Sequence, residues 1–166
     1  MSTSSFNKKG AVGFGVDIPF VTHMGFELEV FDGGESVITF TPKPEHLNTF
    51  GVTHGGACMT LLDVTMALAA RSVQKEMGAV TIEMKTSFMR PAPGGAALTG
   101  KGRIMHRTAT MAFVEATIFD AAGNACAHST GTFKYVKRLP VGAKTVNDMN
   151  PAKDGSGDGL GIISTD

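Results

Sequence analysis

The alternation of apolar and polar positions predicts a β-hairpin in the first third of the chain. Residues 18–31 begin with an apolar stretch and continue as a strand, and a second strand resumes within 34–42. In this second run Ile38 and Phe40 alternate with Val37, Thr39 and Thr41. The turn residues Asp32-Gly33-Gly34 separate the two runs, and such an arrangement is typical of a hairpin.

After a loop over 42–54, one long apolar segment predicts a helix from about 55 to 76. The centre of this segment, 57–70, contains only three polar residues, which are Thr60, Asp63 and Thr65. A helix that is apolar on nearly all sides is a buried helix. Charged residues in 71–76 and Gly78 just beyond them mark its expected end.

Beyond the helix the pattern changes to a period of two, which is typical of strands. A turn at 91–95 is followed by three more strand-like runs, at 96–107, 109–120 and 125–137. One central helix with strands grouped after it predicts an α+β fold, in which the helix packs on an antiparallel sheet. Within the first of these runs Val80, Ile82, Met84, Thr86 and Phe88 alternate with Thr81, Glu83, Lys85 and Ser87.

Length and composition fit one globular domain, because the chain has 166 residues, 42% of them hydrophobic and 18% charged. We expect the domain to span 18–139, between a flexible arm at 1–17 and a flexible tail at 140–166. The formal net charge is +0, which disfavours general nucleic-acid binding. The chain shows no secretory signal and no apolar run near the ~18 residues of a membrane span, so a cytoplasmic protein without a membrane partner is expected.

The residue types that hold metals or act as nucleophiles are few and scattered. Cys58 and Cys126 stand among small apolar neighbours, which favours buried free thiols over a disulfide or a nucleophile. No Gly-x-Ser-x-Gly elbow is present, and no cofactor is expected. The remaining histidines show no metal-ligand spacing, so no metal is expected; they are His23, His46, His106 and His128.

The most informative residue is Asp63, because an unpaired carboxylate is costly to bury. Nine residues before it, His54-Gly55-Gly56 stands at the start of the helix. A helix N-terminus presents free N–H groups and a partial positive charge, and glycines leave those amides uncovered. This arrangement suits a developing oxyanion. The alternative for Asp63 is a solvated helix position, or one bonded to a neighbouring backbone group.

Asp63 lies too far along the helix to act on a carbonyl held at the amides of its own chain. The separation is roughly 12 Å at 1.5 Å per residue. A two-fold dimer, in which the helix start of one chain faces Asp63 of the other, would resolve this.

These residues resemble the phenylacetate-pathway (PaaI-like) type of hotdog-fold acyl-CoA thioesterase. The resemblance rests on an Asn, a short gap, a Gly, then His-Gly-Gly and an acidic helix residue, as found across 46–56 and at Asp63. Phe88 to Ala92 also resembles the family's segment after the helix, and the resemblance covers about 20–137. It implies a single hotdog domain with the sheet wrapped around a long central helix, and dimers or tetramers with sites at subunit interfaces.

The resemblance also implies hydrolysis of acyl-CoA, with aryl or medium-chain groups as expected substrates, and a role for each matching residue. Asp63 would activate water as a general base or attack directly, and the backbone N–H of Gly55 would polarise the thioester carbonyl. Asn48 would help to place the carbonyl or the water, and His54 would shape the loop. Thr81 matches a hydroxyl found near the attacking water.

A basic segment suggests where the phosphates of CoA bind. Residues 71–107 contain seven basic and two acidic residues, and Arg suits phosphate. Arg90 and Arg107 are the candidates, against the alternative of an ordinary solvated strand face. Two other functions stay open: a hydratase or dehydratase on the same fold, and a non-catalytic acyl-CoA-binding protein.

Overall fold

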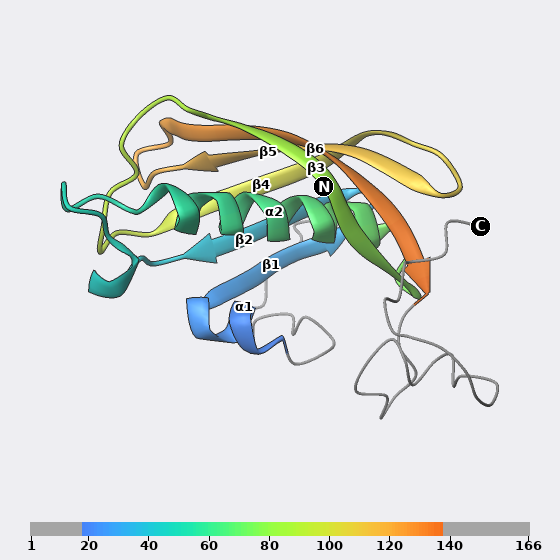
Figure 1. Cartoon of the computed structure of the whole chain (residues 1–166), viewed down its shortest axis with the longest axis horizontal. Helices are drawn as coiled ribbons and strands as arrows, with labels where there is room; N and C mark the ends of the chain where they lie inside the picture. Colours follow the sequence, from blue (N-terminus) through green and yellow to red (C-terminus); the bar gives the residue numbers. More distant parts are fainter. Residues whose placement is uncertain (1–17, 138–166) are drawn as a thin grey trace, which may run out of the picture.

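The computed structural model describes residues 18–137, which form one antiparallel sheet with a long helix against it (Figure 1). The predicted arm and tail fall outside the described residues. The strands lie in the spatial order β1-β2-β4-β5-β6-β3, so β1 and β3 form the two edges. Their bounds are β1 (Phe26–Asp32), β2 (Glu35–Phe40), β3 (Met77–Phe88), β4 (Leu98–Arg107), β5 (Met111–Phe119) and β6 (Ala125–Lys137).

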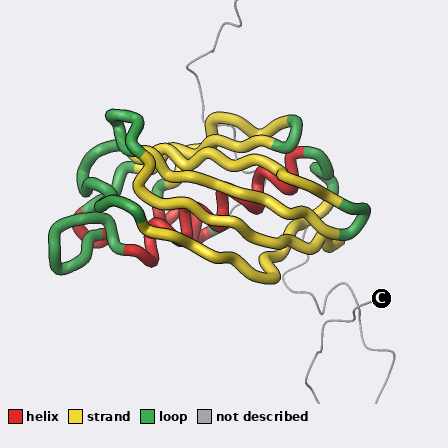
Figure 2. Tube along the Cα trace, turned by 90° about the horizontal axis from the view of Figure 1, so that it is seen from above, coloured by secondary structure: helices red, strands yellow, loops and turns green. Residues whose placement is uncertain are grey.

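The long helix α2 (Gly55–Ser72) runs along the inner side of the curved sheet, as the views in Figures 1 and 2 show. Its residues Leu61, Leu62 and Met66 are completely buried, and they meet Ile38, Val114 and other strand residues in one hydrophobic core. The predicted α+β architecture, a hotdog domain with its sheet around a central helix, is therefore confirmed.

Glycines in β4 allow α2 to approach the sheet closely. A β-carbon on Gly100 would lie 2.7 Å from Thr65 Oγ1, and one on Gly102 would lie 2.9 Å from Thr65 Cγ2. Both distances are below van der Waals contact, so only glycine fits under this turn of the helix. Close packing here fixes the position of α2, and hence of the side chains on its other face.

Buried hydrogen bonds fix the same helix to the sheet at several points along its length. Ser36 Oγ donates to the Thr65 carbonyl at 2.6 Å, and Tyr135 Oη donates to the Ala70 carbonyl at 3.0 Å. Near the helix end Ser72 Oγ accepts from the Gly34 N–H at 2.7 Å. Because buried polar groups are costly to leave unpaired, these bonds favour one position of α2 on the sheet.

The helices differ from the prediction in two places. The long helix ends at Ser72, not near residue 76, because the chain makes tight turns in which the Gln74 N–H donates to the Arg71 carbonyl and the Met77 N–H to the Gln74 carbonyl. The apolar start of 18–31 forms a short helix, α1 (Pro19–Met24), with Pro at its beginning and Gly25 in the left-handed conformation at its end. A single 3₁₀ turn (Pro44–His46) lies in the following loop.

The predicted regular alternation along β3 is wrong at its centre. Thr81 pairs with Phe133 and Glu83 pairs with Thr132, so one extra residue, Ile82, is inserted as a β-bulge. Because a bulge adds one residue, side chains before and after it no longer follow one continuous alternation between the two faces of the sheet. Thr81 therefore faces the helix, together with Met84, whereas Val80 and Ile82 are 43% and 54% exposed.

Two negative findings apply to the described part of the chain. None of its helices is long and apolar enough to cross a membrane. Between residues 18 and 137 no group of three or more His, Cys, Asp or Glu side chains is arranged to hold a metal ion.

Candidate active site

The start of α2 leaves the Gly55 N–H without an acceptor among the described residues. His54 is the N-cap, and its Nδ1 accepts from the Gly56 N–H at 2.9 Å. The Gly55 N–H is the first of the helix and has no intrahelical acceptor; no other acceptor for it occurs among the described residues. The pattern His-Gly-Gly thus produces a capped helix start with an available N–H group.

Asn48 shapes the loop beside this helix start. Its Oδ1 accepts from the N–H groups of Phe50 at 2.9 Å and Val52 at 3.3 Å. Gly51, with φ of 73°, closes the turn, since few other residues adopt that conformation without strain. The side-chain NH₂ of Asn48 makes no hydrogen bond within residues 18–137 and remains available as a donor.

His46 anchors the loop from the buried side. It is buried and its ring lies 5.2 Å from that of Phe40. Its Nδ1 accepts from the Lys43 N–H at 3.0 Å, and its carbonyl accepts from the His54 N–H at 2.8 Å. His46 therefore positions His54, the residue that caps α2. The sequence did not indicate this role.

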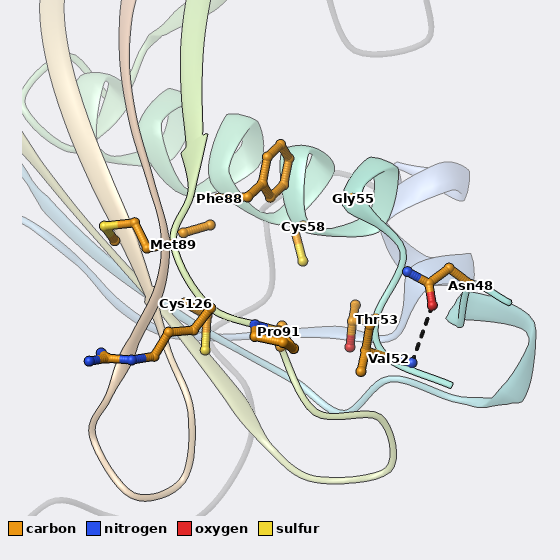
Figure 3. A pocket seen from close by; sticks show the side chains of 12 residues that line it. Asn48, Val52, Thr53, Gly55, Cys58, Phe88, Met89, Pro91 and Cys126 are labelled. Carbon is orange, nitrogen blue, oxygen red and sulfur yellow. Dashed lines mark hydrogen bonds between the residues drawn. The ribbon is translucent and has the colours of Figure 1, made fainter. Parts of the chain in front are cut away.

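Asn48 and Gly55 line a cavity of about 380 Å³ at the N-terminal end of α2 (Figure 3). Its walls come from the loop before α2, from α2 itself, from the end of β3 and the segment after it, and from β6. The other lining residues are Val52, Thr53, Cys58, Phe88, Met89, Arg90, Pro91, Ala92, Cys126 and Ala127. Its volume lies within the range of about 300–1,000 Å³ that is common for ligand pockets.

Asp63 and Thr81 meet further along the helix. Thr81 Oγ1 donates to Asp63 Oδ1 at 2.7 Å, a contact that depends on the bulge at Ile82. The second carboxylate oxygen of Asp63 has no hydrogen-bond partner in the described chain. Asp63 is half-buried, on a stripe of α2 that the sheet does not cover and that also includes Gly56, Met59 and Thr60. The helix is thus less completely buried than its composition predicts.

Within one chain the candidate residues form two separate groups. Asn48 and Gly55 belong to the cavity, whereas Asp63 and Thr81 do not line it. Asp63 stands eight positions after Gly55 on the helix, or about 12 Å along its axis.

The two candidate arginines also lie apart. Arg90 lines the cavity at the N-terminal end of α2, and its Nη1 is 3.5 Å from the Ala125 carbonyl. Arg107 lies in a different hollow with Arg103, Gly34 and Val73, near the C-terminal end of α2. One chain therefore does not bring Arg90 and Arg107 to a common ligand.

The sequence did not indicate that Cys58 and Cys126 line the cavity. Cys58 on α2 and Cys126 on β6 are both buried and free, as their apolar neighbours predicted, but they line the same cavity (Figure 3). Burial, and secondarily the nearby Cys126, raise the pKa of the Cys58 thiol to about 11. Nothing in the local sequence indicated that the two residues, 68 positions apart, would line one cavity.

Residues 50–127 match the Thioesterase superfamily. A protein of Saccharolobus solfataricus named "Putative esterase" is 35% identical over 111 residues, which cover 67% of this chain and 78% of that protein. Human acyl-coenzyme A thioesterase 13 is 25% identical over 89 residues, covering 54% of this chain and 64% of that protein. The chain belongs to the Thioesterase superfamily and is a thioester hydrolase.

Solved structures show the same fold. The PaaI protein from the phenylacetic acid degradation operon of E. coli superposes with a TM-score of 0.67 at 24% identity, covering 70% of this chain and 83% of that one. A Streptococcus mutans protein bound to acetyl-CoA superposes with a TM-score of 0.63 at 25% identity, covering 69% and 91%. These superpositions agree with the superfamily assignment at the level of the fold.

Proposed function

We propose that this enzyme hydrolyses aryl or medium-chain acyl-CoA thioesters, with Asp63 as its catalytic carboxylate. The observation that supports the proposal most directly is the hydrogen bond from Thr81 to Asp63 on the uncovered stripe of α2. A half-buried carboxylate positioned by one hydroxyl, with its other oxygen available, can accept a proton from water or attack a carbonyl.

The two roles of Asp63 differ in what its free oxygen does. As a general base, that oxygen accepts a proton from the water that attacks the thioester carbonyl. As a nucleophile, it forms a mixed anhydride that water then hydrolyses. In both cases the bond between the carbonyl carbon and the sulfur breaks, the thiolate of CoA leaves, and Thr81 keeps the carboxylate in position.

The carbonyl oxygen would be stabilised at the start of α2. In this proposal the Gly55 N–H donates to it, and the helix dipole favours the developing negative charge. The available NH₂ of Asn48 lies at the same cavity and supplies a second donor. His54 contributes by capping the helix through Gly56, which fixes the direction of the Gly55 N–H.

We further propose that each complete site combines two chains. Gly55 and Asp63 are too far apart along one helix for a single chain to bind the thioester carbonyl at Gly55 and attack it with the help of Asp63. The uncovered stripe of α2 and the exposed side chains of Val80 and Ile82 on the edge strand β3 offer an apolar surface for a second copy. A two-fold axis beside this edge would place Asp63 of one chain opposite Gly55 of the other.

For the phosphates of CoA, Arg90 is the better of the two candidates because it lines the cavity that holds Asn48 and Gly55. Its guanidinium group would pair with phosphate oxygens at the rim. Arg107 could reach the same ligand only from a neighbouring chain.

The first experiment measures thiol release from a panel of acyl-CoA thioesters by the wild type and by Asp63→Asn. The wild type should release CoA from aryl and medium-chain substrates, and Asp63→Asn should lower kcat by about 10³-fold, the scale of a lost acid–base group. Glu76→Gln, at an exposed position, is the matched control and should retain full activity. Undiminished turnover by a folded Asp63→Asn would refute the mechanism.

A complementation experiment tests the shared site. Asp63→Asn and Asn48→Ala are each expected to be nearly inactive, but hybrids refolded from a mixture would contain one site with neither substitution. Statistical pairing predicts recovery of about a quarter of the wild-type rate in a dimer with two-fold symmetry. If the mixture stays as inactive as its parents while hybrids demonstrably form, Asn48 and Asp63 act within one chain.

A further inference from the structure

The cavity at the start of α2 has its uncharged polar groups at one end. Asn48 and the Gly55 backbone stand at this end, and the hydroxyl of Thr53 is already bonded to the Pro93 carbonyl at 2.9 Å. Arg90, which is exposed, is the one charged residue of the lining. The rest of the wall is apolar and contains several small residues: Cys58, Ala92, Cys126 and Ala127. A ligand whose polar group sits against Asn48 and Gly55 would therefore extend an apolar part toward these small side chains.

The two thiols are suited to an apolar wall and poorly suited to covalent chemistry. With a pKa of about 11, Cys58 is uncharged at neutral pH, and a neutral thiol is a weak nucleophile. Burial also raises the pKa of Cys126, and its Sγ contacts the Asn124 carbonyl at 3.7 Å. Buried cysteines of this kind behave as small hydrophobic residues.

We propose that this cavity receives the acyl group and that Cys58 and Cys126 determine how large an acyl group it accepts. The proposal rests on the proposed function, because the thioester carbonyl must sit at Asn48 and Gly55. The acyl chain then passes between α2 and β6, where the two small side chains leave room that leucine in either place would fill. The preferred substrates carry an apolar acyl group larger than acetyl.

Phe88 forms the other boundary of the same space. Its ring lies over the start of α2, where a β-carbon on Gly55 would be 3.4 Å from Phe88 Cζ. The ring thus packs against the proposed oxyanion donor, and Figure 3 shows it on the α2 side of the cavity. Size selection is assigned to the thiols because they are buried, whereas Phe88 is 54% exposed.

The first test compares Cys58→Leu and Cys126→Leu with the wild type across acyl-CoA thioesters of increasing size. Each substitution should lower kcat/KM for medium-chain and aryl substrates at least tenfold and leave acetyl-CoA or butyryl-CoA within threefold. Cys126→Ala, which removes volume from the wall, should shift the ranking toward larger acyl groups. A uniform loss for all substrates by folded leucine variants would overturn the size-selection proposal.

A second test does not depend on hydrolysis or on the leucine variants folding. The whole chain contains only two cysteines, and both line the cavity, so thiol modification reports directly on its occupancy. Modification of the wild type by methyl methanethiosulfonate should slow at least fivefold with a non-hydrolysable decyl-CoA thioether and little with S-methyl-CoA, which has no free thiol to consume the reagent. Equal protection by S-methyl-CoA, or no protection by either ligand at saturation, would overturn the proposal.

The two tests separate this proposal from the proposed function. If the wild type hydrolyses no thioester but the decyl thioether protects the thiols, the acyl site stands and the catalytic proposal fails. If hydrolysis depends on Asp63 but neither thiol is protected and leucine does not change the ranking, the catalytic proposal stands and the acyl group binds elsewhere.

Discussion

The two faces of α2 differ sharply in how they are constrained. The face toward the sheet is packed against β4 at Gly100 and Gly102, where no β-carbon fits, and it is bonded through Ser36 and Tyr135. The opposite face carries Asp63, half-buried, with Thr81 as its hydrogen-bond partner.

The difference shows how the fold separates stability from chemistry. Packed glycines and buried hydrogen bonds hold the helix at a fixed height and rotation, so that the uncovered face presents its carboxylate in a defined place. Substitutions on the packed face should therefore change the free energy of unfolding, and those on the uncovered face should change the rate. Four predictions test this contrast, beginning with the largest expected effect.

Gly100→Ala should destabilise the fold, because the new methyl group would lie 2.7 Å from Thr65 Oγ1. Overpacking of this kind costs about 1–3 kcal/mol, measurable by urea denaturation. Combining it with Thr65→Ala removes the obstructing atoms, so the double variant should lose less stability than the two single losses added together. Strict additivity would show that the close approach of β4 and α2 does not limit packing.

Thr81→Val should reduce kcat about tenfold, equivalent to about 1.4 kcal/mol in the barrier, while leaving the urea midpoint nearly unchanged. The reason is that Asp63 loses the hydroxyl that positions it. Thr132→Val is a matched control, because Thr132 Oγ1 donates to Glu83 Oε1 at 2.7 Å in the same strand pair but away from Asp63. Equal rate losses for both variants would mean that the Asp63 contact has no specific role.

His54→Ala should remove the N-cap of α2 and cost about 1 kcal/mol of stability, as cap deletions usually do. It should also lower kcat, since the direction of the Gly55 N–H is no longer fixed. Asn is a good capping residue, so His54→Asn should restore most of both quantities. Failure of Asn to restore kcat while it restores stability would assign His54 a direct part in the reaction.

Arg90→Gln should raise KM for acyl-CoA severalfold, leave kcat almost unchanged and weaken inhibition by free CoA. Loss of one charged hydrogen bond to phosphate at an exposed rim has about this effect. Arg107→Gln, in the separate hollow, should change KM less. A larger effect of Arg107→Gln would place Arg107 in the CoA site through a neighbouring chain and contradict the assignment of Arg90.

Much of the fold could be predicted from patterning alone. The apolar centre of α2 and the period-two runs define one helix and an antiparallel sheet, because burial selects a period of 3.6 for helices and two for strands. The motif from Asn48 through His54 and Gly55 to Asp63 likewise pointed to thioester chemistry. These features are local in the sequence, and each can be recognised within a single element.

Other features depend on contacts between distant elements. The bulge at Ile82 exists only through the pairing of β3 with β6, and it turns Thr81 toward Asp63. The helix ends at Ser72 because the next residues turn back toward the sheet. Arg90 and Arg107 lie near opposite ends of α2, and a count of basic residues along the sequence does not reveal this separation.

The sequence by itself determined the type of each main element, the superfamily resemblance and the candidate residues Asn48, Gly55 and Asp63. Those properties follow from local periodicity and from short motifs around one helix start. Only the tertiary structure decided that Thr81 reaches Asp63, that His46 supports His54, and that Cys58 and Cys126 share a cavity. Such contacts join elements far apart in the chain, and they arise when the sheet curves around α2 and brings its strands against the helix.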